Sequence, residues 1–145
     1  MSFSSETKSE LAQIIPEDRC CLLAEISGFV RMCGTIRLEG PGKVSLHLVT
    51  EHAAGTRMIL KLMKKYFGIK AELIITKNQA LKKNNTYEMV LGENEHCHQI
   101  LQEMGILKME GGTLSIDYDV PENIVKKKCC KRAFLRGAFL GAGSL

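Results

Sequence analysis

The chain has 145 residues, of which 25% are charged and 45% hydrophobic, and these are ordinary values for a globular domain. That length predicts one domain with enough apolar surface to form a core without a disulfide or a structural metal. No apolar run is long enough to span a bilayer and the amino terminus has no signal-peptide pattern, so we expect a cytoplasmic protein without a membrane partner.

The net charge of +4 is unevenly distributed. Residues 57–83 carry eight basic side chains against one acidic one, and residues 121–137 carry six against one. Residues 1–25 carry five acidic side chains against two basic ones. Clustered positive charge favours a polyanionic partner.

Helix and strand patterns alternate along the chain. Capping serines predict a first helix that Pro16 ends, and Asp18 predicts the start of a second helix reaching about Cys33. The segments that follow predict a hairpin (35–40 and 43–50), an amphipathic helix (51–68), a second hairpin (69–76 and 86–92), a helix (93–105), a further strand (112–120) and a last helix (about 122–142). Gly34 is expected to end its helix in a left-handed conformation, and Gly68 is expected to end the amphipathic helix.

Hairpins separated by helices predict an α+β fold, with an antiparallel sheet covered by helices on one face. We expect residues 1–17 to form an amino-terminal helix and residues 18–145 to form the main domain. The other face of the sheet is then free, and the strand patterns place on it Arg37, Glu39, His47, Lys70 and Glu72.

Small residues recur at steps of four in two of the predicted helices. Ala24 and Gly28 lie in one, and Ala133, Gly137 and Gly141 in the other. Residues four apart share a helix face, and small side chains there let a second helix approach backbone to backbone. Because glycine inside a helix costs about 1 kcal/mol relative to alanine, the pattern predicts that these five residues form a helix-pair interface.

The stretches "SGFVRMCGTI" (27–36) and "RGAFLGAGSL" (136–145) resemble the motif of the LAGLIDADG homing endonucleases. The resemblance implies two paired motif helices below saddle-shaped sheets that sit in the DNA major groove. It also implies that an acid before the last glycine of each motif binds the catalytic metal. Cys33 and Ala142 stand at those positions, and Arg31 and Leu140 stand where the motif has its first Asp. Because neither Cys nor Ala is a ligand for Mg²⁺, we expect no catalytic residue, no metal site and no enzymatic activity.

The amino-terminal "MSFSSETKSELAQI" and the tail "KKKCCKRAFLRGAFLGAGSL" are similar to a narrower family, the WhiA regulators of sporulation and cell division. Proteins of that family join a degenerate LAGLIDADG domain to a carboxy-terminal helix-turn-helix. The resemblance implies a non-catalytic regulatory domain, associated with the nucleoid, with roles in sporulation, cell division and chromosome segregation. Since the chain stops inside the second motif, we expect it to be the amino-terminal part of such a protein.

Three functions are compatible with these patterns. The first is binding of double-stranded DNA, with phosphate contacts from the sheet and its turns. The residues expected to make them are Arg37, Lys70, Lys77, Lys82 and Lys83. The second is a protein-interaction module that binds the missing carboxy-terminal part, another regulator or a second copy. The third and least supported is a nuclease that uses acids outside the motif: Glu25, Glu39, Glu51, Glu72 or Asp117.

The chain has six cysteines and no CxxC pair. In a reducing cytosol we expect them to be small buried hydrophobic residues, and we expect no cofactor. The alternative is a zinc site, whose best support in the sequence is the run His96, Cys97, His98. Consecutive residues on a helix point in different directions, which makes that run a poor ligand set.

Overall fold

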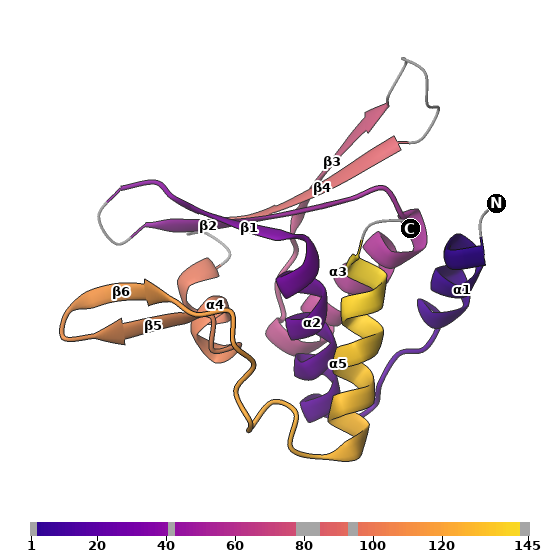
Figure 1. Ribbon diagram of the computed structural model, residues 1–145. Coiled ribbons are helices and arrows are strands. Elements are labelled where there is room, and N and C mark those ends of the chain that lie inside the picture. The colour runs from indigo at the N-terminus through magenta and orange to yellow at the C-terminus, as the bar shows by residue number, and fades with distance from the viewer. Residues whose placement is uncertain (1–2, 41–42, 78–84, 93–95, 143–145) are drawn as a thin grey trace.

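The computed structural model describes residues 3–40, 43–77, 85–92 and 96–142, and Figure 1 shows a sheet lying across one end of a group of helices. The sheet contains β1 (Gly34–Leu38), β2 (Val44–Thr50), β3 (Glu72–Lys77) and β4 (Asn85–Leu91). Their spatial order is β1-β2-β4-β3, and every neighbouring pair is antiparallel. The predicted α+β architecture with two hairpins is therefore confirmed.

Five helices accompany the sheet in the described part of the chain: α1 (Phe3–Leu11), α2 (Arg19–Cys33), α3 (Ala53–Phe67), α4 (Cys97–Glu103) and α5 (Lys128–Gly141). The strand register sets Ile36, Leu46 and Leu91 side by side on one face of the sheet. Leu46 and Leu91 are fully buried there, in the same core as Phe29 of α2 and Leu62 of α3. The helices thus cover one face of the sheet, as the alternation in β2 predicts.

The region after α4 differs from the prediction. A single strand over 112–120 is expected from the sequence, but the structure has a separate hairpin of β5 (Leu107–Glu110) and β6 (Thr113–Ile116). Gly111 and Gly112 form its turn with φ of 58° and 81°, a conformation that favours glycine. The last helix begins at Lys128 rather than near residue 122. Residues 121–127 form turns instead, in which the Ile124 amide donates to the Pro121 carbonyl.

Gly34 ends α2 for a reason other than the one predicted. Its φ of −88° and ψ of 142° are extended rather than left-handed. A Cβ atom at this position would lie 2.5 Å from the Val30 carbonyl oxygen and 3.2 Å from the side chains of Leu46 and Leu48. Glycine is therefore required by close packing under the sheet. Gly68 ends α3, as predicted, and it does so in a left-handed conformation with φ of 69°.

Candidate functional site

The two motif helices, α2 and α5, lie side by side and run in the same direction (Figure 1). A Cβ atom on Gly137 would collide with the backbone of Glu25, and one on Gly141 would lie 2.8 Å from the Phe29 carbonyl oxygen. A Cβ on Gly28 would collide with the Phe134 carbonyl and lie 2.9 Å from the Ala138 nitrogen. The helices therefore meet backbone to backbone at all three glycines.

The two alanines of the predicted interface lie in a small core between the same helices. Ala24 and Ala133 are buried there beside Cys21 and Cys130. All five residues named from the sequence thus face the junction of α2 and α5.

An ion pair crosses this junction. Arg136 of α5 donates from Nη2 and Nε to Oε1 of Glu25 in α2, at 2.6 and 2.8 Å. The Glu25 side chain is fully buried, and its Oε2 has no hydrogen-bond partner. Burial raises the pKa of Glu25, and the charge and hydrogen bond of Arg136 oppose that rise. No pattern in the sequence predicts this pair, because its partners lie more than a hundred residues apart.

The ends of the two helices hold no acid at the motif positions. Cys33 donates from Sγ to the Phe29 carbonyl at 3.4 Å, and burial raises its pKa to about 12, so that it stays a neutral thiol. At the end of α5, the Ala142 carbonyl accepts a hydrogen bond of 2.5 Å from the ammonium of Lys8, whose side chain is buried. A cation from α1 therefore already satisfies the negative end of the α5 dipole.

Arg31 stands where the motif has its first acid, and in the structure it has a structural role. Its guanidinium donates to the carbonyls of Ser27, Met104, Tyr118 and Asp119. These contacts join α2 to the end of α4 and to the segment that follows β6. The residue at the corresponding position of α5, Leu140, is fully buried in the main core.

The open face of the sheet is less basic than the sequence predicts. The register places Arg37 on this face together with Glu72, Glu88, Val49 and Ile74. His47 was also expected to line this face; it lies there but is buried beside Ser45, 3.2 Å from the hydroxyl.

The remaining predicted DNA contacts are dispersed. Lys77 is exposed but lies on the opposite face of β3, on the side of Leu73 and Ile75. Lys70 is exposed and precedes the strand. Lys82 and Lys83 lie outside the described residues.

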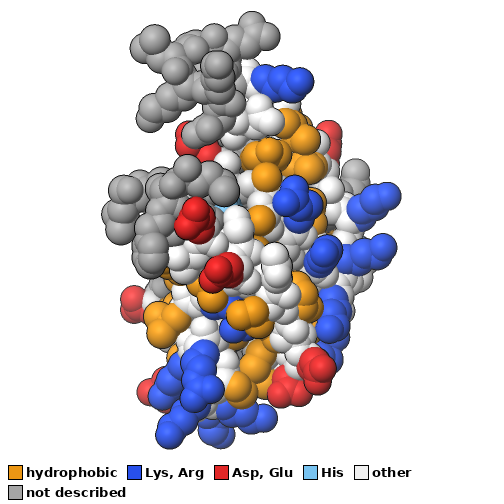
Figure 2. All heavy atoms as spheres, turned by 90° about the vertical axis from the view of Figure 1, so that its right-hand side faces the viewer, with side chains coloured by type: hydrophobic (Ala, Val, Ile, Leu, Met, Phe, Trp, Pro, Cys, Tyr) orange, Lys and Arg blue, Asp and Glu red, His pale blue; other side chains and the backbone are white. Residues whose placement is uncertain are grey.

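Basic side chains gather instead on two helical surfaces. We call the exposed residues of α3 the α3 basic stripe: Arg57, Lys61, Lys64 and Lys65. We call the exposed residues around the start of α5 the α5 basic cluster: Lys126, Lys127, Lys128, Lys131 and Arg132. Figure 2 shows Lys and Arg side chains along one side of the molecule and at the end remote from the sheet.

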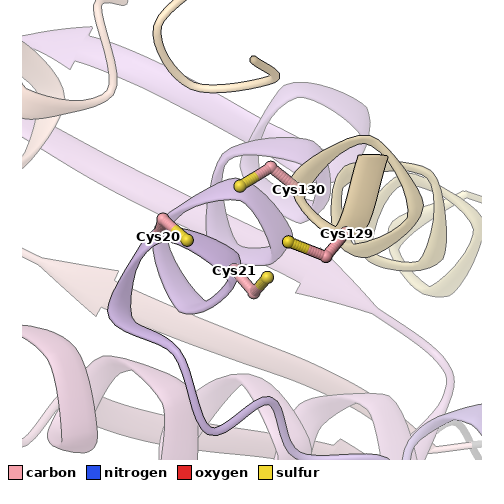
Figure 3. A group of neighbouring side chains, drawn as sticks. All are labelled: Cys20, Cys21, Cys129 and Cys130. Carbon is pink, nitrogen blue, oxygen red and sulfur yellow. The ribbon is translucent and has the colours of Figure 1, made fainter. Parts of the chain in front are cut away.

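Four of the six cysteines meet at the first turns of α2 and α5. Cys20 and Cys21 come from α2, and Cys129 and Cys130 from α5, with all four sulfur atoms within 4.8 Å of one another. Figure 3 shows the four side chains pointing toward one another. Burial raises the pKa of Cys21, and a hydrogen bond from Cys21 lowers that of Cys129.

The prediction of uniformly buried cysteines is wrong for Cys129, which is exposed, whereas Cys97 is fully buried in the main core. The cluster could have been found from the sequence. Cys20 precedes Ala24 by four residues, and Cys129 precedes Ala133 by four, so that parallel pairing of the small residues also brings the cysteine pairs together.

None of the helices in the described ranges is long and apolar enough to cross a membrane.

The sequence profile of the WhiA N-terminal LAGLIDADG-like domain matches residues 19–107. Two relatives, each named "Probable cell division protein WhiA", come from Alkaliphilus oremlandii and Heliobacterium modesticaldum, and they are 47% and 43% identical over the whole chain. The chain spans 46% and 44% of their lengths, so it corresponds to about half of each relative.

Two solved structures share the fold. Full-length DUF199/WhiA from Thermatoga maritima aligns with 97% of this chain and 39% of its own, with a TM-score of 0.58 and 20% identity. The N-terminal LAGLIDADG domain of DUF199/WhiA aligns with 97% of this chain and 58% of its own, with a TM-score of 0.60 and 20% identity. The paired helices, the antiparallel sheet and the sequence match agree, and the chain belongs to the WhiA family, whose amino-terminal LAGLIDADG-like domain it contains.

Proposed function

We propose that the chain is a non-catalytic, DNA-associated regulatory domain of a WhiA-type cell-division regulator. The role in cell division follows the name of the relatives. The resemblance to the WhiA regulators further implies roles in sporulation and chromosome segregation. A protein of this kind acts at the nucleoid.

The observation that carries the proposal is the state of the two motif-helix ends. The backbone-close packing that a homing endonuclease needs is retained at Gly28, Gly137 and Gly141. Phosphodiester hydrolysis by metal ions needs oxygen ligands beside the scissile phosphate. Here a protonated thiol occupies one motif position, and an alanine, whose carbonyl is bonded to a lysine ammonium, occupies the other. The scaffold is kept while its chemistry is replaced, which supports a binding role.

DNA contact is proposed for basic side chains in and beside the two hairpins. The residues assigned to this contact are Arg37, Lys70 and Lys77, which are exposed, together with Lys82 and Lys83, which lie outside the described residues. Ammonium and guanidinium groups on strands and turns bind phosphates without reading bases, so the expected affinity is weak and largely independent of sequence.

The test is the salt dependence of binding to a labelled duplex, measured by fluorescence anisotropy between 50 and 200 mM salt, a range over which phosphate contacts strongly affect affinity. Three to five phosphate contacts give a slope of log affinity against log salt of roughly −3 to −4.5. Charge reversal of Arg37, Lys70 and Lys77 together should flatten that slope by roughly 2 to 3 units.

The matched control reverses three charges of the α3 basic stripe, namely Arg57, Lys61 and Lys64. Lys65 is left unchanged because its ammonium donates to the Pro16 carbonyl and so supports the fold. This control should leave the slope nearly unchanged. If the control flattens the slope and the hairpin variant does not, then the DNA contact lies on α3 and the analogy with the saddle-shaped sheet is wrong.

A second candidate, a protein-interaction module, is favoured by exposed apolar side chains on the sheet. Leu38 is 66% exposed and Ile75 53% exposed, and Val49 and Ile74 add apolar surface to the open face. Its partner would be a second copy, another regulator or the remainder of a longer protein. Absence of DNA binding at low salt together with self-association in gel filtration would favour this candidate over DNA binding.

A further inference from the structure

We propose that Cys20, Cys21, Cys129 and Cys130 bind one Zn²⁺ ion in a closed structural site between the first turns of α2 and α5. Structural zinc is held by four ligands in a tetrahedron, and a set of four cysteines is one of its common ligand sets. With zinc–sulfur bonds of about 2.3 Å, the sulfurs of such a site lie roughly 3.8 Å apart. Here every pair of sulfurs lies within 4.8 Å, so small side-chain rotations suffice to reach that geometry.

The helix pair places these four side chains together with little freedom. The backbone contact of Gly137 with Glu25 and that of Gly141 with Phe29 fix α5 against α2 in one register. Cys20 lies one turn before Ala24 and Cys129 lies one turn before Ala133, and these two alanines are buried in the same small core between the helices. The cysteine pairs therefore meet at the amino-terminal ends of both helices. Since the two sides of the site belong to rigid elements, the ligands are arranged before the ion binds.

The surroundings suit the charge of the bound site. Four thiolates around one Zn²⁺ carry a net charge of −2. The site lies at the amino-terminal ends of two helices, where the dipoles favour negative charge. Six exposed basic side chains lie within three residues of one of these cysteines along the chain: Arg19, Lys126, Lys127, Lys128, Lys131 and Arg132. The α5 basic cluster thus has a role in this site that does not require a nucleic acid.

The donor set selects the metal. Thiolate is a soft ligand that prefers zinc over Mg²⁺ or Ca²⁺. Sulfurs no more than 4.8 Å apart can all be reached by a single ion, and with four protein ligands no position is open for a substrate. The earlier candidate, His96 with Cys97, does not form a comparable group. Cys97 is buried in the core, and His96 is exposed before α4 with φ of 57°.

The ion would act as a clamp on the helix pair. It joins α2 to α5, which are more than a hundred residues apart in the chain. It lies at the amino-terminal ends of the two helices, opposite to Cys33 and Ala142 at their carboxy-terminal ends. A homing endonuclease carries its catalytic metal at the motif end. The zinc site is thus distinct in position and chemistry from a nuclease centre, and its existence does not depend on DNA binding.

The test is metal analysis of the 145-residue chain, purified anaerobically with a reductant and without chelator or histidine tag. We expect about one zinc per chain by inductively coupled plasma mass spectrometry. After exchange for Co²⁺, we expect sulfur-to-cobalt charge-transfer absorption and the intense visible bands of a tetrahedral thiolate site. Protein that retains free thiols and binds neither zinc nor Co²⁺ would overturn the proposal.

Cys129→Ser is the informative variant because the side chain is exposed, so the change does not disturb packing. It should lose the ion to a competing chelator and lose the four-thiolate cobalt spectrum. Cys33→Ser is the matched control, since Cys33 lies at the other end of α2 and Ser can keep the hydrogen bond to the Phe29 carbonyl. Its metal content should match that of the unaltered chain. An unchanged cobalt spectrum in Cys129→Ser would place the ion elsewhere and overturn the assignment.

A stability measurement separates a structural ion from a loosely held one. Removal of zinc by a chelator should lower the melting temperature by at least about 5 °C, because metal binding contributes directly to folding. Cys33→Ser should show the same chelator-dependent shift, and Cys129→Ser should show almost none. Equal melting temperatures with and without zinc in the unaltered chain would contradict the structural role.

Discussion

The guanidinium of Arg136 lies 2.6 Å from the carboxylate of Glu25, and this contact joins the two motif helices at a point where the carboxylate is fully buried. A carboxylate loses its hydration when it is buried, and here a single cation replaces part of that hydration. One carboxylate oxygen remains without a partner. Removing Arg136 alone would therefore leave the Glu25 carboxylate buried without a counter-charge.

Arg136→Met should destabilise the protein strongly, because it leaves the Glu25 carboxylate buried without a counter-charge. Removing one partner of a buried ion pair costs about 3–5 kcal/mol. The double variant Glu25→Gln with Arg136→Met should recover much of that loss, since it removes the unpaired charge. Urea denaturation of the four proteins in this cycle measures both effects. A double variant no more stable than Arg136→Met would show that the buried charge is not the cause.

The same ion pair predicts a pH dependence of stability. Burial raises the folded-state pKa of Glu25, so as the pH rises the unfolded chain releases this proton before the folded chain does. The free energy of unfolding should therefore fall as pH rises from about 4.3, the usual pKa of Glu, to the raised folded value, and should change no further above it. Glu25→Gln lacks this contribution. Its stability relative to the unaltered chain should improve as pH rises from 4 to 7, and parallel curves would contradict the prediction.

Gly137→Ala should weaken the helix pair although alanine is the better helix former. The added Cβ collides with the backbone of Glu25, which cannot move aside as a flexible side chain could. The expected cost is about 1–3 kcal/mol, and Gly28→Leu or Gly137→Leu should cost more.

Gly55→Ala in α3 is the matched control for this prediction. Its Cβ would lie 3.2 Å from Nδ1 of the His52 side chain, 3.6 Å from the Leu140 carbonyl oxygen and 3.8 Å from the Phe29 ring, so a small shift of His52 accommodates it and the change should be close to neutral. Lys64→Ala, on the exposed side of α3, should also be close to neutral. If thermal melts of the Gly137 variants shift no more than these controls, the helices do not depend on close approach.

The sequence predicted features that rest on local periodicity, and it missed those that rest on distant contacts. The step of four from Ala133 to Gly141 identified the helix face, and the alternation in β2 identified the core side of the sheet. The pairing of Glu25 with Arg136 has no local signature, because it exists only once the two helices are in register.

The site on the sheet was less predictable than the sheet itself. Arg37 is predicted on a strand and Lys77 in the turn that follows residue 76, whereas Lys77 is the last residue of β3 in the structure. The face that a strand residue occupies depends on strand register, and a shift of one residue reverses it. The cysteine cluster was missed for a different reason. Its ligands show no metal-binding spacing within a single segment, such as CxxC, because the two halves come from separate helices.

Arg31→Ala should release the segment that follows β6. The guanidinium donates to the carbonyls of Tyr118, Asp119 and Met104, and these acceptors lose their partner in the variant. Hydrogen bonds to charged groups contribute about 1.5–3 kcal/mol each, although they are not additive. Hydrogen exchange measured by mass spectrometry should show faster exchange over residues 117–125 with little change in the sheet. Arg31→Lys should rescue only partly, since one ammonium cannot reproduce the planar fork.

The purified chain should not hydrolyse DNA in the presence of Mg²⁺ or Mn²⁺. Cys33 and Ala142 provide no side-chain oxygen at the motif positions. Two acids outside the motif, Glu25 and Asp117, already form ion pairs or hydrogen bonds within the protein. Glu25 is paired with Arg136, while Asp117 accepts from Lys108 at 3.0 Å and from the Asp119 amide at 2.9 Å. A plasmid-nicking assay with each metal checks this prediction, and Glu25→Gln and Asp117→Asn serve as diagnostic variants. Cleavage that persists in both variants and separates from the protein during further chromatography indicates a contaminant. Cleavage that co-purifies with the chain and is abolished by either change would show that a carboxylate outside the motif supports catalysis, and the non-catalytic assignment would then be wrong.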